Sequence, residues 1–317
     1  MNHGTEFSLG ALAAVCAACF TNPLEVVKTR MQLQGELKAR GHYTVFYRNT
    51  FHALYTVAKY DGLRGIQSGL APALGYQISM NGTRLGSFQI MVDMGLTDGV
   101  DCTFCGFLRT LLAAGLSGAV SNAVGSPFFM IKTHIQCKTD SKIAVGYQHT
   151  HKTMYQAVKE IVGHDGVKGL WRGASAGTLR GFIGSAAQLG AFTSTKKYFI
   201  FKEARNKCNI YHIFVEDSMM ISILASMVGG ISLAFFMTPF DVVCIRLYNQ
   251  RTTESGKGMY YKGISDCFRK TYRSEGIAGL YKGWEPALIR IWPHTVLCLV
   301  FWDCFRDAYY KWNKSKA

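Results

Sequence analysis

The stretch NPLEVVKTRMQ at residues 22–32 places a proline inside an apolar, helix-like run and follows it with charged residues. Related stretches return as SPFFMIKTHIQ at 126–136 and as PFDVVCIRLYNQ at 239–250. A proline within a helix removes a backbone hydrogen bond and kinks the helix. The three stretches therefore predict an internal repeat of about one hundred residues, in which three kinked helices converge at one end.

A second motif follows each of these stretches at a nearly constant distance. It reads DGLRGIQSG at 61–69, DGVKGLWRG at 165–173 and EGIAGLYKG at 275–283, and its last glycine opens another long apolar stretch each time. A single short pattern often arises by chance, but three copies in step with a second motif are strong support for a repeat. We therefore expect a single transmembrane domain, 1–317, made of three tandem repeats: 1–100, 101–210 and 211–317.

The composition favours a membrane protein. Of the 317 residues, 49% are apolar and 17% are charged. Three stretches, 8–27, 107–131 and 218–240, approach the roughly 20 residues that a spanning helix needs. Small residues at four-residue spacing within them suit close helix packing in lipid. The expected fold is all-α with six transmembrane helices, and no nucleic-acid partner is expected.

A short amphipathic helix is expected inside each repeat, at 51–60, 153–162 and 265–274. These segments are too short to cross a bilayer and mixed enough to lie on its surface. The loops that hold them carry much of the basic excess, namely Arg40, Arg48, Lys138, Lys142 and Lys152. Basic loops face the inner side of a membrane, so both termini should lie on the opposite side.

The overall charge also points to anions. Lysine and arginine outnumber aspartate and glutamate by 35 to 20, which leaves a formal charge of +15. The chain has two CxxC pairs, Cys16 with Cys19 and Cys102 with Cys105. Neither pair has an adjacent histidine or a second pair nearby, so we expect no metal site and no other cofactor.

These features resemble the mitochondrial carrier family, solute carrier family 25, over nearly the whole chain. The signature is the repeated P-x-[DE]-x-x-[KR] followed by [DE]-G-x-x-x-x-[aromatic]-[KR]-G. LAPALGYQISMNGTRLG at 70–86 and RIWPHT at 290–295 look closest to the member 34/35 subgroup, itself similar to the fungal oxaloacetate carrier. The resemblance implies a threefold pseudosymmetric six-helix barrel in the mitochondrial inner membrane that works by alternating access. Its termini would face the intermembrane space, and it would function as a monomer.

In that family the acid of each motif pairs with the base of the next repeat and closes the matrix side. Carried over, Glu25 would pair with Lys132, and Asp241 would pair with Lys28. Gln32 and Gln136 lie one turn beyond the base positions and could brace these pairs. Tyr248 takes the third such position.

The third pair of this matrix gate has lost both charges, because Phe129 stands at the acid position and Cys244 at the base position. Removing one partner of a buried ion pair costs about 3 to 5 kcal/mol, whereas replacing both with apolar groups is often neutral. We therefore expect Phe129 and Cys244 to touch.

A common register places candidate solute ligands on the second spanning helices. Seven residues after the motif glycine lie Tyr76, Arg180 and Arg290, and fifteen residues after it lie Arg84, Gln188 and Cys298. These positions share one broad helix face, and in the carrier family they contact the solute. Arginine binds carboxylate in a bidentate fork, so three unpaired arginines in one cavity, Arg84, Arg180 and Arg290, call for an anion with more than one charge. His294 could add a donor, and Asn81 is a further polar candidate.

The resemblance suggests oxaloacetate, malonate, sulfate or related di- and tricarboxylates. Nucleotide carriers of the family favour glycine followed by an aliphatic residue where this chain has Arg180 and Gly181, which argues against adenine. Two other interpretations stay open. An uncoupling or proton-leak carrier shares the architecture, and a membrane-embedded enzyme is the less favoured reading because the sequence shows no nucleophile, base and orienter pattern.

Two further expectations concern lipid and the outer end of the barrel. Backbone N–H groups at helix starts bind phosphate, so 170–173 and 280–283 are candidate cardiolipin sites. Gln67 and Ser68 replace the aromatic and the base in the first copy, which disfavours a site there. The family's outer gate, [FY]-[DE]-x-x-[KR], has a near match at Trp302, Asp303 and Arg306. A partial match lies at Phe192 and Lys196.

Overall fold

The structure is a computed structural model that describes residues 3–38, 43–96, 104–151, 153–205, 219–253 and 258–314. Arg40, Cys102 and Lys152 of the sequence analysis lie outside these residues. Within them the chain is helical, and the extended pairing is limited to one isolated bridge between Thr252 and Gly258. This agrees with the all-α prediction.

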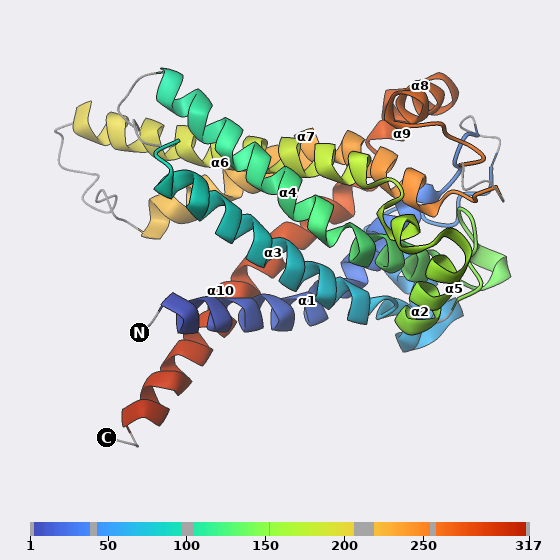
Figure 1. Cartoon of the computed structure of the whole chain (residues 1–317), viewed down its shortest axis with the longest axis horizontal. Helices are drawn as coiled ribbons and strands as arrows, with labels where there is room; N and C mark the ends of the chain where they lie inside the picture. The colour runs from blue at the N-terminus through green and yellow to red at the C-terminus, as the bar shows by residue number, and fades with distance from the viewer. Residues whose placement is uncertain are drawn as a thin grey trace.

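Six long helices pass through the molecule in three consecutive pairs (Figure 1). They are α1 His3–Leu33, α3 Leu70–Asp93, α4 Phe104–Cys137, α6 Ala174–Arg205, α7 Met219–Asn249 and α10 Trp284–Lys314. Each packs against the next in chain order, and α10 returns to pack along α1. The six helices therefore close into a ring, which is the barrel that the sequence predicts.

Short helices lie between the members of each pair. They are α2 Thr50–Ile66, α5 Met154–Asp165 and α8 Ile264–Glu275, with the smaller turns η1 Ser141–Ile143, η2 Val167–Trp171 and α9 Ile277–Leu280. Figure 1 shows α2, α5 and α8 gathered at one end of the molecule, while both chain ends emerge at the other. The predicted amphipathic segments thus form helices, and their boundaries extend by a few residues.

The three repeated prolines, Pro23, Pro127 and Pro239, lie inside α1, α4 and α7. The C-terminal parts of these helices supply much of the most buried core, including Val27, Ile131 and Val243. We call this the closed end of the barrel. It is the same end at which the short helices lie (Figure 1).

Four candidate membrane spans, by length and composition, lie within the described residues: Leu9–Leu33 in α1, Cys105–Cys137 in α4, Ile223–Asn249 in α7, and Ile277–Lys311, which covers α9 and most of α10. The other two long helices, α3 and α6, are of spanning length as well, and they carry residues that line an internal cavity, as described below.

The two long helices of the central repeat, α4 and α6, approach each other closely enough for their backbones to touch. A Cβ atom at Gly118 of α4 would clash with the carbonyl oxygen of Gly181 on α6, and a Cβ atom at Gly181 would clash with that of Gly118. Only glycine fits at such a crossing, which follows the small-residue packing expected of helices in lipid. This contact sets Arg180, next to Gly181, against the inside of the barrel.

Candidate functional site

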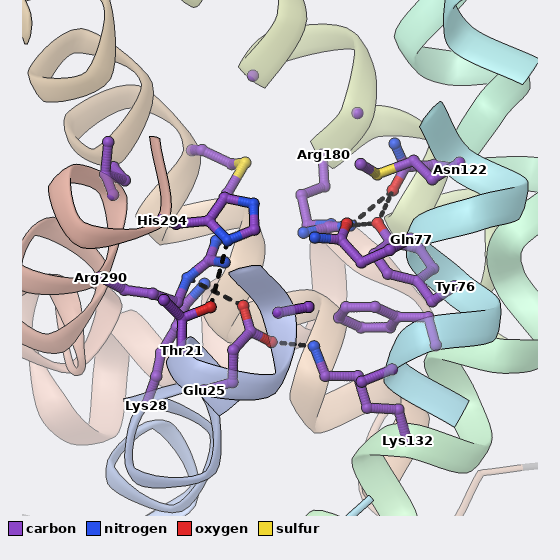
Figure 2. Close-up of a pocket in the computed structure, with 18 of the residues that line it drawn as sticks. Thr21, Glu25, Lys28, Tyr76, Gln77, Asn122, Lys132, Arg180, Arg290 and His294 are labelled. Atoms are coloured by element: carbon purple, nitrogen blue, oxygen red, sulfur yellow. Dashed lines mark hydrogen bonds and ion pairs between the residues drawn. The ribbon is translucent and has the colours of Figure 1, made fainter. Parts of the chain in front are cut away.

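A cavity of about 240 Å³ lies inside the ring, just above the closed end. Every long helix contributes to its wall (Figure 2). The lining holds most of the residues that the sequence singled out, together with two asparagines and a threonine that it did not. These lining residues are Glu25, Lys28, Tyr76, Asn81, Arg84, Phe129, Lys132, Arg180, Gln188, Arg290, His294, Thr21, Asn22 and Asn122.

Two ion pairs join neighbouring repeats at the floor of this cavity. Lys132 Nζ of α4 pairs with Glu25 Oε2 of α1, and Lys28 Nζ of α1 pairs with Asp241 Oδ2 of α7. Both lysine side chains are 8% exposed and Asp241 is 1% exposed. These are the two contacts that the family resemblance implies, and they tie α1 to both of the other kinked helices.

The third position of this floor is aromatic rather than ionic. The Phe129 ring lies between those of Tyr76 and Tyr248, with ring centroids 5.1 and 5.4 Å away. The Arg180 guanidinium carbon lies 4.6 Å from the Phe129 centroid, within reach of a cation–π interaction. Cys244 is fully buried in the same cluster. Direct contact between Phe129 and Cys244 stays a prediction.

Two of the cavity arginines are already paired, which corrects the expectation of three unpaired arginines. Arg180 Nη1 lies 3.0 Å from Asp241 Oδ1, and Arg290 Nε lies 3.0 Å from Glu25 Oε1. The acids at the floor therefore each hold two bases, one from the gate position and one from the cavity wall. Figure 2 shows Glu25 between Lys132 and Arg290.

Arg180 is fixed by a further polar group that sequence reasoning missed. Asn122 Oδ1 accepts hydrogen bonds from Arg180 Nη2 at 2.6 Å and from the Tyr76 hydroxyl at 2.9 Å, and Arg180 Nη2 also contacts the Tyr76 hydroxyl. Asn122 is 6% exposed and interrupts an apolar stretch of α4. A buried amide inside an apolar helix was the signal that could have identified it.

Arg84, Gln188 and His294 lie higher on the wall. Among the described residues, no ion pair to the Arg84 guanidinium is present, so this charge is available to a solute. His294 Nδ1 lies 3.2 Å from Thr21 Oγ1, and its Nε2 lies 3.8 Å from Cys298 Sγ. Both ring nitrogens of His294 therefore lie near polar atoms of the protein itself.

The glutamines at the closed end do not brace the ion pairs as expected. Gln136 Oε1 accepts from Thr29 Oγ1 at 3.0 Å and its Nε2 donates to Asn22 Oδ1 at 3.3 Å. Gln32 is fully buried, and neither side-chain polar atom has a hydrogen-bond partner among the described residues. The reason is steric, because Gln136 packs on Gly69 and Gln32 packs on Gly283, at the starts of α3 and α10.

A second ring of contacts lies one turn below the ion pairs. The residue two places after each base position is Arg30, His134 or Arg246, and each donates to a backbone carbonyl of the following repeat. The accepting carbonyls belong to the equivalent residues Gln136, Tyr248 and Gln32, at 3.0, 2.7 and 3.4 Å. We call these three sets the corners of repeats 1, 2 and 3.

The corners differ in whether an acid pairs with the donating side chain. Arg30 Nη1 also pairs with Asp61 Oδ2 at 2.5 Å, and Arg246 pairs with both oxygens of Glu275 at 2.5 and 2.9 Å. Hydrogen bonds from these arginines keep the short helices α2 and α8 docked. The equivalent acid of repeat 2, Asp165, pairs instead with Arg172 at 2.7 Å.

At the other end of the barrel, which we call the open end, the residues predicted for an outer gate do not bridge helices in this conformation. Asp303 and Arg306 pair with each other along α10 at 3.1 Å, and the Arg306 guanidinium lies over the Trp302 ring. Asp303 is 59% exposed and Arg306 is 38% exposed. Lys196 lies on α6. The structure is therefore linked at the closed end, while these three residues make no described link across the other.

The charges of the site suit anion binding. Five bases line the cavity, and the two acids that balance them, Glu25 and Asp241, leave an excess of three positive charges among the described residues. The bases are Lys28, Arg84, Lys132, Arg180 and Arg290. A low-dielectric interior with such an excess attracts a solute of opposite sign.

Comparison with known proteins agrees with this architecture. The sequence model of the family described as "Mitochondrial carrier protein" matches three successive segments, 1–98, 105–203 and 215–312. Human solute carrier family 25 member 35 is 46% identical, and the alignment covers 96% of this chain and 98% of the relative.

Relatives with a named solute are more distant. The mitochondrial oxaloacetate transport protein of Schizosaccharomyces pombe is 37% identical over 98% of this chain and 92% of its own length. The mitochondrial 2-oxoglutarate/malate carrier protein of Bos taurus is 33% identical over 96% and 90%. With a threefold helical repeat, a charged internal cavity and these similarities, the chain belongs to the mitochondrial carrier protein family and is a membrane transporter of mitochondria, not an enzyme.

Proposed function

We propose that the protein exchanges small anions with more than one negative charge across the mitochondrial inner membrane by alternating access. Oxaloacetate, malonate and sulfate are the solutes we would test first. The observation that carries the proposal is the excess of three positive charges around one cavity. A proton-conducting path alone would not need arginines from three helices.

The size of the cavity supports a small solute. Its volume of about 240 Å³ lies below the roughly 300 Å³ at which drug-sized ligand pockets begin. The names of two relatives, which specify oxaloacetate and 2-oxoglutarate with malate, point to the same size and charge class. Arg180 and Gly181 stand where nucleotide carriers of the family favour glycine followed by an aliphatic residue, which disfavours a nucleotide.

Shared bases suggest how solute binding would be coupled to opening. Arg180 and Arg290 hold the same acids, Asp241 and Glu25, that the gate lysines hold. A dianion that takes both guanidinium groups removes one of the two bases from each acid. The solute and the closed end thus compete for the same charges, and a change in one alters the stability of the other.

The proposed orientation follows from the basic loops. The closed end, with Arg48, Lys138 and Lys142 near it, would face the matrix, and the termini would face the intermembrane space. The present conformation is then the one that receives solute from the intermembrane space. Glu25, Lys28, Lys132 and Asp241, with Phe129 and Cys244, would form the inner gate, and Asp303, Arg306 and Lys196 would contribute to the outer gate of the opposite conformation.

The experiment that tests the function is solute uptake by purified protein in liposomes. Radiolabelled malonate, oxaloacetate and sulfate are offered outside, with and without unlabelled solute inside. Exchange predicts that internal solute accelerates uptake many-fold. Fatty-acid-dependent proton conductance without anion exchange would support the uncoupling alternative and would overturn the proposal.

Arg84→Gln provides the matched test of the binding site. Loss of a charged hydrogen-bonding group costs about 1.5 to 3 kcal/mol, so the KM of a dianion should rise roughly tenfold or more. The control is Arg269→Gln, at an exposed arginine of α8, which should transport like the unmodified protein. Equal KM values for all three proteins would exclude Arg84 from the site.

We also propose bound cardiolipin at the starts of α6 and α10. The glycines before them, Gly173 and Gly283, adopt left-handed backbone angles, with φ of 81° and 75°. In repeat 1 the side chains of Gln67 and Ser68 are used inside the protein, on Asn22, Cys19 and Ile135. Cardiolipin should raise the Tm of detergent-solubilised monomer, and an unchanged Tm would count against these sites.

A further inference from the structure

Three histidines meet at the corner of repeat 2, outside the solute cavity. His134 is on the last turn of α4, and His149 and His151 lie on the segment that leads into α5. One potential ligand nitrogen from each ring lies within 4.8 Å of the other two. The His134 and His149 rings are stacked with centroids 3.5 Å apart, and His151 is 5.3 Å from both.

Each ring uses one nitrogen on an oxygen acceptor. His134 Nε2 bonds to the Tyr248 carbonyl at 2.7 Å, and His149 Nε2 bonds to the Asn249 carbonyl at 3.2 Å. His151 Nδ1 bonds to Glu160 Oε2 at 3.2 Å. A carbonyl or carboxylate oxygen can only accept, so the bonded nitrogen carries the proton. The other nitrogen of each neutral ring therefore presents a lone pair.

Two of these lone pairs are buried without use. His134 and His151 are 3% and 4% exposed, and neither His134 Nδ1 nor His151 Nε2 has a hydrogen-bond partner among the described residues. Burying an unpaired polar atom costs free energy, and native structures rarely leave one without a reason.

We propose that His134, His149 and His151 bind a divalent transition metal, with zinc as the first choice. Three neutral imidazoles suit Zn²⁺ or its neighbours far better than Mg²⁺ or Ca²⁺. The hydrogen bonds to Tyr248, Asn249 and Glu160 are the outer contacts that orient metal-bound histidines. A water molecule would take the fourth position, as in three-histidine sites generally.

The geometry requires a modest contraction. With Zn–N bonds of about 2.0 to 2.1 Å, ligand nitrogens around a tetrahedral ion are roughly 3.4 Å apart. Ring rotations of His149 and His151 on their loop can supply the difference from 4.8 Å, and they would unstack His149 from His134. The ion would then tie the segment before α5 to the end of α4, next to the contact that joins repeats 2 and 3.

The test uses the full-length protein in detergent, stripped with a chelator and then exposed to ZnCl₂. After gel filtration we expect about one zinc per chain and a higher Tm. The double variant His149→Gln, His151→Gln should lose both effects, and Glu160→Gln should bind zinc about 10- to 100-fold more weakly. His164→Gln is the matched control, because this histidine of α5 has a side chain that is 66% exposed and bonds only to its neighbour Asp165 among the described residues.

A second measurement does not depend on the variants folding. Co²⁺ bound by imidazole nitrogens gives visible d–d bands, and Co²⁺ bound by thiolate adds an intense near-ultraviolet charge-transfer band. We expect the visible bands alone. No stoichiometric metal in the unmodified protein, the same zinc content in the double variant, or a thiolate band would each overturn the proposal.

Discussion

The corners of repeats 1 and 3 are held by buried arginine–acid pairs, whereas the corner of repeat 2 is held by histidines. Arg30 with Asp61 and Arg246 with Glu275 satisfy charge locally and dock a short helix. At repeat 2, His134 keeps the backbone contact to the next repeat, but its equivalent acid pairs elsewhere. Each repeat therefore keeps a side-chain hydrogen bond to a backbone carbonyl of the following repeat, whereas an acid pairs with that side chain in repeats 1 and 3 but, among the described residues, not in repeat 2.

The largest effect should come from breaking a buried corner. Glu275→Gln leaves Arg246, which is fully buried, and Lys282 without their carboxylate. Removing one partner of a buried pair costs about 3 to 5 kcal/mol, so the Tm should fall sharply or folded protein should be lost.

The matched change in repeat 2 is Asp165→Asn. The side chains of its ion pair are less buried than those of Arg246 and Glu275, with Arg172 20% and Asp165 13% exposed, so the pair should contribute less. The Tm of this variant should fall by less than that of Glu275→Gln. Equal losses in the two variants would mean that the corners do not differ in the way described.

The next effect concerns the missing ion pair of repeat 2. Cys244→Arg places a charge in a fully buried position and should destabilise the protein by about 3 kcal/mol or more. Combined with Phe129→Asp, part of that loss should return, with a coupling of at least about 1 kcal/mol in thermal unfolding. Additive losses would show that the two positions do not face each other.

Lowering the pH should weaken the two arginine corners, with a smaller effect on stability than the substitutions above. Burial opposes ionisation of Glu275, but hydrogen bonds from Arg246 prevail and lower its pKa, and hydrogen bonds from Thr139 and Arg30 likewise overcome burial at Asp61. A carboxyl whose folded pKa is lowered stabilises the fold above its unfolded pKa and loses that contribution as pH falls through the folded pKa. Stability should therefore decline below about pH 4.5, the ordinary value for glutamate.

Glu160→Gln offers the comparison for this acid effect, because Glu160 belongs to the histidine corner and its side chain is 44% exposed. Its Tm should depend on pH as that of the unmodified protein does. If Asp61→Asn also leaves the acid dependence unchanged, the arginine corners are not its source.

The smallest effect should come from the open end. Asp303→Asn removes one side of an exposed pair within α10, and such pairs contribute about 0.5 kcal/mol or less. Its Tm should be unchanged within error. A clear loss of stability would indicate that Asp303 links helices at this end in the purified protein.

Much of this arrangement follows from the sequence because it depends on local spacing. The prolines, the motif glycines and the register of Arg180 and Arg290 repeat along the chain, so one helix predicts the next. The pairing of Glu25 with Lys132 follows from the family resemblance once the three copies are aligned. The sequence pattern does not reveal that one carboxylate can pair with two bases. It therefore gave no partner for Arg180 or Arg290.

The histidine corner shows a different limit. His134 is on the last turn of a helix, whereas His149 and His151 lie on the segment before α5, where His151 takes the place of Tyr47 and Tyr261 in the other repeats. Their approach depends on the path of that segment and on hydrogen bonds to α5 and α7, which no spacing rule describes. From the sequence, only the cysteine pairs raise the question of metal binding, and none is expected there, because motif spacing detects ligands that are near in sequence.

The aromatic position at the floor of the cavity makes the three seams of the barrel unlike in kind. Two gate positions hold lysine–acid pairs, whereas the third holds Phe129 packed between two tyrosines, with the Arg180–Asp241 pair beside it. Ionic strength weakens Coulombic contacts, whereas cooling weakens apolar ones. The relative strength of the three gate positions would then change with salt and temperature.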